Sequence, residues 1–270
     1  MNSLRQFSAY LKRIYLEQVS YKTALALTLI TAAISLLQFV FMGNFIKEGN
    51  SFPGISAYGG DILSYFVTGS IFTGFVGICV SSFSSYLSLE QRGGTLESVF
   101  ASPMPLIKTM LFSAAAGLIG TISGSALMIF IFGFIFKISF NINILGLLII
   151  LFSLTLTLFG FGLAGCGVLL VTKKGDPITW VFTTATALLS GVMFPVSILP
   201  QWMQYISHLI PTTVALDGIR LAMLSSASPD RLISIIFQLF LWSFISVPAG
   251  IFVFRRGLAL SRKHGSLSDY

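Results

Sequence analysis

Long apolar segments, separated by short polar ones, make up most of the chain. Six of these segments have roughly the 20 residues that a helix needs to cross the hydrocarbon core of a bilayer. They are residues 24–46, 62–86, 107–136, 142–171, 178–194 and 232–254. The pattern therefore predicts an all-helical membrane protein with six transmembrane helices.

The composition supports a membrane location. The chain has 270 residues, of which 55% are hydrophobic and 9% are charged, whereas soluble domains carry about 25% charged residues. So few charges cannot cover a surface that faces water. The first apolar segment has no clear signal-peptide cleavage site, and we interpret it as an uncleaved span. Cys79 and Cys166 lie inside apolar segments, which argues against a disulfide framework.

The basic residues are distributed unequally between the two sides of this six-span arrangement. One side carries Arg5, Lys12, Arg13, Lys22, Arg92, Lys108, Lys173, Lys174, Arg255, Arg256, Arg262 and Lys263. The other side carries Lys47, Lys137, Arg220 and Arg231. Because cytoplasmic loops are enriched in Lys and Arg, we predict that both termini are cytoplasmic. The net charge of +7 then reflects the ends of spans in contact with membrane lipids and indicates no nucleic-acid partner.

The segment before the first span has the spacing of an amphipathic helix. Its apolar or aromatic residues recur at Leu4, Phe7, Leu11, Ile14, Tyr15 and Val19. We predict that residues 1–23 form a helix that lies in the cytoplasmic interface of the membrane. The alternative is a simple extension of the first span. Residues 24–254 then form the transmembrane domain and residues 255–270 a cytoplasmic tail.

Ionisable residues are nearly absent from the span interiors, which argues against proton or sodium coupling by this chain. Uncharged polar residues occur in the first, second and fifth spans instead. As a group, they are candidates for lining a weakly polar pathway: Thr31, Gln38, Thr68, Thr73, Thr179, Thr183 and Ser190. Any single hydroxyl could instead bond to a carbonyl of its own helix.

Glycines are frequent within the spans. Residues 160–165 read GFGLAG, which fits the dinucleotide pattern G-x-G-x-x-G by letter but lacks the strand and βαβ unit that this pattern requires. We predict close helix packing there, and likewise at Gly69, Gly74, Gly77, Gly117, Gly120 and Gly124. The motif G-x-x-x-x-G-K-S/T does not occur, so the chain does not bind ATP through a P-loop of its own.

The polar stretch LEQRGGTLESVFASPMPL, residues 89–106, separates the second and third spans. Gly93 and Gly94 would break the preceding helix, and Thr95 would cap a new one that carries Glu97 near its positive end. The apolar face of this helix would consist of Leu96, Val99 and Phe100. Pro103 would end it. We therefore predict a short helix at about residues 94–102, the alternative being an ordinary loop.

A second interrupted segment precedes the last span. Its prolines prevent one continuous helix: Pro195, Pro200 and Pro211. We predict one or two short helices at about residues 195–220 on the outer side, with Trp202 and Tyr205 at the membrane interface. Asp217 and Arg220 could pair on a helix, a pair that adds little stability where it is exposed.

These two segments resemble the type 2 exporter permeases of ATP-binding-cassette (ABC) transporters. The sequence EQRGGTLESVFASPMP is similar to that family's cytoplasmic pattern E-x-x-x-G-T-x-E-x-L-x-x-(S/T)-P, with Val99 in place of the commoner leucine. The sequence FPVSILPQWMQYISHLIPTTVALDGIR resembles the pattern F-P-x-x-x-L-P-x-W-x-x-x-(I/L)-x-x-x-x-P-x-T-x-x-x-(D/E)-x-x-R. With the six spans, the resemblance extends over nearly the whole chain.

The resemblance implies two permease subunits, expected to be a homodimer, and two cytoplasmic ABC ATPase subunits that bind ATP and Mg. This chain would contain no catalytic residue, cofactor or metal. The helix at residues 94–102 would be the coupling helix, with Leu96 or Phe100 as the knob that enters a groove of the ATPase. The coupling residues would be Glu90, Arg92, Gly94, Thr95, Leu96, Glu97, Val99, Phe100 and Pro103. The outer gate would include Phe194, Pro195, Trp202, Pro211, Asp217 and Arg220.

The function expected from this resemblance is export from the cytoplasm or inner leaflet across the cell inner membrane. The weakly polar spans favour an amphipathic, lipid-like or drug-like substrate. Export of a polysaccharide or lipid-linked glycan is the alternative within the same mechanism. Outside it, a passive channel or a carrier remains open, whereas a membrane enzyme would need clustered His, Asp or Glu residues, and those present are scattered.

Overall fold

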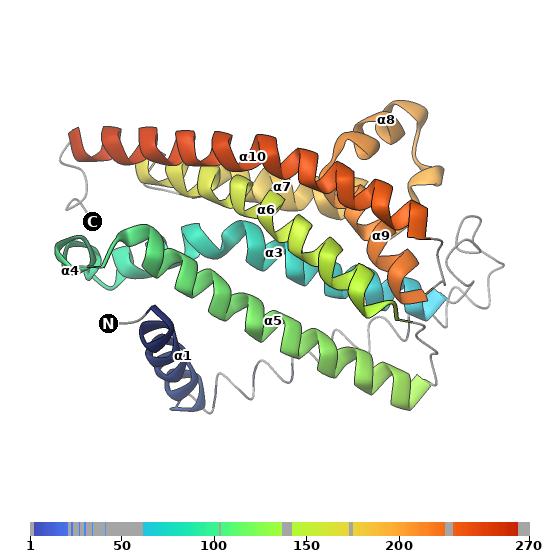
Figure 1. Cartoon of the computed structure of the whole chain (residues 1–270), viewed down its shortest axis with the longest axis horizontal. Helices are drawn as coiled ribbons and strands as arrows, with labels where there is room; N and C mark the ends of the chain where they lie inside the picture. The colour runs from blue at the N-terminus through green and yellow to red at the C-terminus, as the bar shows by residue number, and fades with distance from the viewer. Residues whose placement is uncertain are drawn as a thin grey trace. The chain divides into compact units, whose positions relative to one another are not determined.

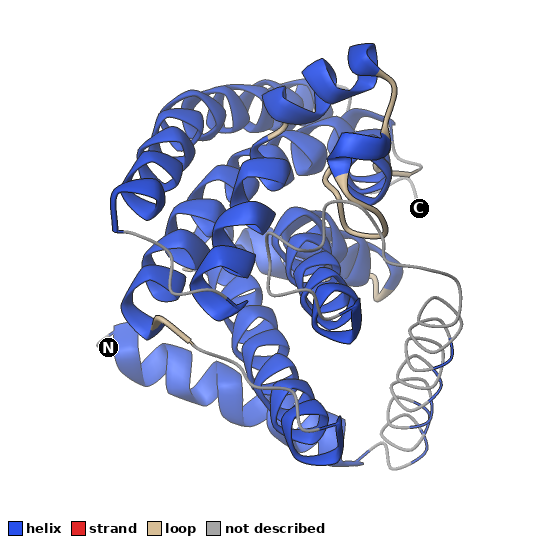
Figure 2. Ribbon diagram, turned by 90° about the vertical axis from the view of Figure 1, so that its right-hand side faces the viewer, coloured by secondary structure: helices blue, strands red, loops and turns tan. Residues whose placement is uncertain are grey.

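All regular structure in the described part of the chain is helical. The computed structural model describes residues 3–20, 62–102, 104–136, 142–172, 175–224 and 229–263, with single helical positions at Thr23, Leu27, Ile30, Ile34 and Phe41. Within these residues no strand occurs (Figure 2), so the predicted all-helical class is confirmed. The chain divides into two compact units, residues 1–53 and residues 54–270.

The first unit begins with helix α1, Ser3–Ser20. Its apolar side chains Phe7, Leu11 and Ile14 are half-buried, whereas Arg5, Lys12 and Arg13 are exposed, and so is Tyr15, a residue predicted for the apolar face. This distribution agrees with the amphipathic helix predicted for residues 1–23. The predicted first span, residues 24–46, lies outside the described residues apart from single helical positions.

Four long helices form most of the second unit (Figure 1). They are α3, Ile62–Arg92; α5, Leu106–Phe136; α6, Ile144–Thr172; and α10, Pro229–Lys263. Each is long and apolar enough to cross a membrane, because a helix rises about 1.5 Å per residue and the hydrocarbon core is about 30 Å thick. The predicted spans at residues 62–86, 107–136, 142–171 and 232–254 therefore correspond to candidate membrane helices. Helix α10 continues through Lys263, so the predicted tail begins as a helix.

The predicted fifth span differs from the structure. Helix α7, Pro177–Leu189, has only 13 residues and is about 20 Å long. The chain then turns at Gly191, whose φ is 78°, a conformation that glycine adopts without strain. The prediction of one helix over residues 178–194 is therefore wrong, because this turn stops the helix before the apolar segment ends.

Short helices follow this turn. They are the 3₁₀ helix η2, Val196–Ile198; α8, Gln201–Leu209; and α9, Pro211–Leu224. Pro200 lies just before α8, and Pro211 is the first residue of α9, where its missing N–H costs nothing. The interrupted helical segment predicted for residues 195–220 is thus present.

Helix α6 lies between α10 and α3, and α3 also packs against α5 (Figure 1). Glycines allow the backbones of α6 and α10 to touch: a Cβ on Gly250 would lie 2.1 Å from the Gly160 carbonyl oxygen, and a Cβ on Gly257 would lie 2.1 Å from that of Gly167. The close packing predicted for residues 160–165 is confirmed at this seam. For four of the other glycines it stays a prediction, since no described atom lies within 4 Å of their Cβ positions: Gly74, Gly77, Gly120 and Gly124.

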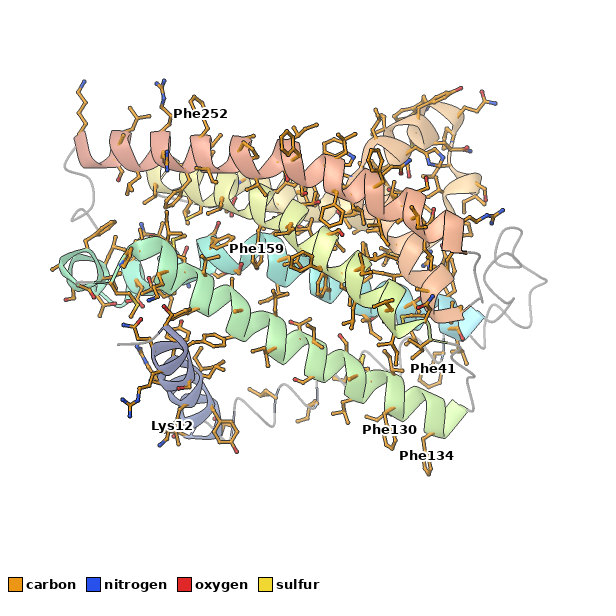
Figure 3. All side chains as sticks on the ribbon, viewed as in Figure 1. Lys12, Phe41, Phe130, Phe134, Phe159 and Phe252 are labelled. Atoms are coloured by element: carbon orange, nitrogen blue, oxygen red, sulfur yellow. The ribbon has the colours of Figure 1, made fainter. Side chains whose placement is uncertain are left out.

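Aromatic side chains lie both in the interior of the second unit and on its outer surface. Phe159 lies inside the bundle (Figure 3), with its ring centroid 5.0 Å from that of Phe83 on α3. Phe130 and Phe134 near the end of α5 and Phe252 on α10 point away from the bundle. Such apolar surface is typical of helices surrounded by lipid.

Candidate functional site

The turn between α3 and the short helix α4, Leu96–Ala101, is closed by backbone hydrogen bonds. The Thr95 N–H donates to the Glu90 carbonyl over 3.0 Å, and the Gly94 N–H donates to the Gln91 carbonyl over 3.1 Å. This pair of bonds, with Gly94 at φ 65°, is the Schellman arrangement that ends many helices. The predicted break at Gly93 and Gly94 is therefore confirmed.

Thr95 lies at the N-cap position of α4, as predicted, and its carbonyl accepts the Val99 N–H over 3.0 Å. Its hydroxyl makes no cap bond to α4. It donates instead to the Glu90 carboxylate and, over 3.3 Å, to the Glu90 carbonyl, because the Schellman turn brings Glu90 close.

Helix α4 directs its first residue into the interior of the chain. Leu96 is 3% exposed and packs in an apolar cluster with Phe83 and Leu87 of α3 and Met110 of α5. Leu96 is thus unavailable as a surface knob in this structure, because the same apolar character that suits a partner's groove also suits the chain's own core. Phe100 is half-buried at the edge of this cluster.

The outer side of the turn and of α4 is polar and exposed. It includes Arg92, Gly94, Thr95 and Ser98, while Val99 is half-buried. The side chain of Glu97 and the whole of Pro103 lie outside the described residues. One surface of this small helix is therefore held by the bundle and the other is open to a partner.

A buried arginine lies at the opposite end of the second unit, where α8 and α9 are found (Figure 1). The side chain of Arg220 on α9 is 1% exposed. It donates to the Gly191 carbonyl over 3.0 Å, to the Tyr65 carbonyl over 3.3 Å and to the Thr68 hydroxyl over 3.5 Å. A buried guanidinium is costly unless its donors find acceptors, and here α3 and the turn after α7 supply them.

Tyr65 completes this cluster from α3. Its hydroxyl donates to the same Gly191 carbonyl over 2.5 Å, and its ring centroid lies 3.5 Å from the Arg220 guanidinium carbon, within the range of a cation–π contact. Gly69 leaves room for the turn, because a Cβ there would lie 2.7 Å from the Val192 carbonyl oxygen. We call Arg220, Tyr65, Thr68 and Gly191 the arginine cluster.

A chain of hydroxyl groups continues from the arginine cluster towards α8 and α9. The Thr212 hydroxyl lies 2.7 Å from that of Ser190 and 3.2 Å from that of Thr186. The Ser207 hydroxyl donates to the Leu189 carbonyl over 2.5 Å. These bonds fix the start of α9 and the end of α8 to the end of α7.

The predicted pathway residues fall into different environments. Thr68 and Ser190 are buried within the polar contacts just described. Thr73 is exposed, but its hydroxyl donates to the Gly69 carbonyl of its own helix, and the half-buried Thr183 bonds in the same way to the Thr179 carbonyl. Thr31 and Gln38 lie outside the described residues. Hydrogen bonds within this chain thus engage each described member of the group.

Of the predicted gate residues, only Arg220 enters the arginine cluster. Pro195 and Pro211 are buried in the neighbouring turns, and Phe194 and Asp217 are half-buried. Trp202 is 63% exposed on α8, in keeping with the predicted interfacial position.

Sequence reasoning missed three partners: Tyr65, Gly191 and Asp176. The first two bind Arg220, and the third joins α7 to α3. The sequence signal for Asp176 is its position before Pro177, because Asp is a favoured N-cap residue and Pro is favoured in the first turn of a helix. Among the described residues, no group of three or more His, Cys, Asp or Glu side chains comes together.

The fold and these sites define a multi-pass α-helical membrane protein with an open polar loop at one end and a buried polar cluster at the other. Residues 5–224 match the family model described as ABC-2 type transporter. The match covers most of the chain, which therefore belongs to this family and is a permease component of an ABC transporter, with the ATPase in a separate subunit. The comparison with curated proteins gives no match.

Proposed function

We propose that this chain is the permease half of an exporter in the cell inner membrane, with both termini in the cytoplasm. A separate ATPase, present in two copies, binds ATP and Mg and drives a homodimer of this chain. The observation that carries this proposal is α4, which is fixed to the bundle on one side and open on the other. Membership of the ABC-2 type transporter family supports the need for an ATPase.

Helix α4 is proposed to be the coupling helix. Its exposed side, with Arg92, Thr95 and Ser98, would contact the ATPase, and Phe100 is the remaining candidate for the knob. Leu96 has a different role, because its burial among side chains of α3 and α5 holds α4 against the bundle. A force on α4 would therefore pass directly into α3.

The orientation of the second unit is supported by its charges. Exposed cations at the α4 end include Arg92, the last residue of α3, and, on the last turns of α10, Arg255, Arg256 and Lys263. At the α8–α9 end, Arg231 is exposed and Arg220 is buried. Since the side richer in exposed cations is usually cytoplasmic, the α4 end is proposed to face the cytoplasm and the ATPase.

The α8–α9 segment is proposed to form the outer gate. The arginine cluster would hold the turn after α7 against α3 in the closed state, and opening would require this turn to move. The exposed aromatic side chains of Trp202 and Tyr205 on α8 suit the membrane interface, where such rings are enriched.

The substrate is proposed to be amphipathic, lipid-like or drug-like. Several hydroxyls of the second and fifth spans are already engaged in bonds within the chain, including those of Thr68, Thr183 and Ser190. Fewer hydroxyls are then available to bind a sugar, which favours this substrate over a polysaccharide or a lipid-linked glycan. A channel or carrier without an ATPase fits the family less well.

A matched pair of substitutions tests the coupling role of α4. Ser98→Trp places a bulky group on the exposed side of α4, and Ser197→Trp does so on exposed η2 at the other end. In membranes that contain the cognate ATPase, Ser98→Trp should abolish co-purification or ATP-driven transport, whereas Ser197→Trp should leave co-purification intact. Normal assembly and transport in Ser98→Trp would refute the coupling assignment.

A further inference from the structure

The carboxylate of Asp176 lies where three helices meet. It is the N-cap of α7: its Oδ1 accepts the Thr179 N–H over 3.0 Å, and its Oδ2 accepts the Thr179 hydroxyl over 2.5 Å. The same Oδ2 accepts a hydrogen bond from the hydroxyl of Ser84 on α3. Asp176 therefore caps the N-terminus of α7 and also binds α3.

The Asp176 carboxylate fits closely among residues of α6 and α3. Gly165 on α6 leaves the space, because a Cβ there would lie 2.8 Å from the Asp176 Oδ1 atom. Ser84 is 5% exposed and follows Phe83, a member of the apolar cluster that also contains Leu96 of α4. Hydrogen bonds to a charged acceptor are stronger than neutral ones, and this one joins α7 to the part of α3 nearest α4.

The far end of α7 is joined to α3 a second time. The chain after α7 reaches Gly191, whose carbonyl accepts hydrogen bonds from Tyr65 of α3 and from Arg220. Tyr65 and Ser84 are about 28 Å apart along α3 at 1.5 Å per residue. Polar contacts therefore hold α7 to α3 at both ends, whereas the middle of α7 contacts α6 through the rings of Phe182 and Phe161, with centroids 4.5 Å apart.

We propose that Asp176 is a positioning residue that makes α7 follow α3 when the ATPase moves α4. This inference rests on the proposed function. A displacement of α4 passes through Leu96 into the end of α3, and the Ser84 hydroxyl transmits it to Asp176 and the start of α7. Because α7 leads directly to Gly191, the movement reaches the turn that Arg220 holds.

Capping and joining can be separated by substitution. Asp176→Asn retains an acceptor for the Thr179 N–H, and Asn is a good N-cap residue, but its amide offers Ser84 only a neutral hydrogen bond, which the serine hydroxyl accepts from the amide nitrogen. Ser84→Ala removes the join and leaves the cap untouched. Ser85→Ala is the matched control, since Ser85 is the neighbouring exposed residue of α3, and Ser84→Thr should restore the donor.

The experiment uses the complex of the full chain with its ATPase in lipid vesicles and needs no substrate. Ser197→Cys on exposed η2 provides the reporter, and the native Cys79 and Cys166 are buried. The maleimide labelling rate at position 197 is measured without nucleotide and after trapping with ATP and vanadate. In the parent and in Ser85→Ala, trapping should change this rate.

In Ser84→Ala, ATP hydrolysis should continue while the trapping-dependent change falls roughly tenfold, the effect of losing one charge-assisted hydrogen bond. Asp176→Asn keeps a neutral hydrogen bond to Ser84, so the change should fall by less. Ser84→Thr should restore the change. If Ser84→Ala responds like Ser85→Ala, Asp176 is only a cap and the inference is wrong. If the parent itself neither binds the ATPase nor responds to ATP, the proposed function fails and the inference fails with it.

Discussion

The two ends of the second unit use polar groups in opposite ways. At the α4 end, Arg92 and Thr95 are exposed, and the hydrogen bonds of the turn join residues no more than five positions apart. At the α8–α9 end, Arg220 is buried, and its bonds to Gly191 and Tyr65 join residues 29 and 155 positions apart. One end presents its polar groups, whereas the other encloses them.

This difference distinguishes an exposed polar surface from a buried polar cluster that holds helices together. An exposed polar group exchanges water for a partner at little cost to the fold, which suits reversible contact with another subunit. A buried donor or acceptor that loses its partner pays its full desolvation cost. The polar groups of the α4 end are therefore accessible, whereas the arginine cluster holds one arrangement of α3, α7 and α9.

Replacing Arg220 should have the largest effect on stability. Arg220→Met fills much of the same space but removes the two charge-assisted hydrogen bonds to the Gly191 and Tyr65 carbonyls. At roughly 1.5–3 kcal/mol for each hydrogen bond to a charged group, we expect the free energy of unfolding to fall by about 3 kcal/mol. Thermal unfolding of the protein in detergent micelles measures this loss.

Arg231→Met is the control for that substitution, since Arg231 is exposed at the start of α10. Its effect should stay within about 0.5 kcal/mol, as for most surface substitutions. Equal losses in the two variants would show that the arginine cluster does not stabilise the packing of α3, α7 and α9, and the contrast between the two ends would disappear.

The same contrast explains how much the sequence could predict. The break before α4 depends on Gly94 and its immediate neighbours, so a local pattern was sufficient. Thr95 is the N-cap residue as predicted, but its hydroxyl does not bond to α4, because it points to Glu90 five positions back. The four long helices were also predictable, because the length and hydropathy of each are properties of one continuous segment.

The arginine cluster could not be predicted in this way. Arg220 is predicted to be a gate residue, but its partner Tyr65 lies 155 positions earlier. Which carbonyl meets the guanidinium depends on how α3, α7 and α9 pack. The end of α7 at Leu189, earlier than predicted, could not be predicted for the same reason. The turn at Gly191 that follows it accepts hydrogen bonds from Tyr65 of α3 and from Arg220 of α9.

Two glycines with positive φ, one at each end, provide a sharper comparison. Alanine in this conformation costs about 1–2 kcal/mol, which should be the whole effect of Gly94→Ala, because no described atom lies within 4 Å of its Cβ position. Gly191→Ala should cost about 1 kcal/mol more, since its Cβ would lie 3.1 Å from Val196 Cγ2 and its carbonyl belongs to the arginine cluster. Thermal unfolding of both variants gives the difference. A greater loss in Gly94→Ala would reverse the expected order.

The smallest effects are expected from removing one hydroxyl at each end. Tyr65→Phe keeps the ring beside Arg220 but removes a buried hydrogen bond to Gly191, at a cost of about 1 kcal/mol. Thr95→Val removes an exposed hydroxyl, and the free energy of unfolding should change by about 0.5 kcal/mol or less. Urea-dependent unfolding of the two variants under one set of conditions measures both. If Thr95→Val lowered the free energy of unfolding more than Tyr65→Phe, the turn before α4 would also stabilise the fold, and its exposed side chains could no longer be assigned to a partner alone.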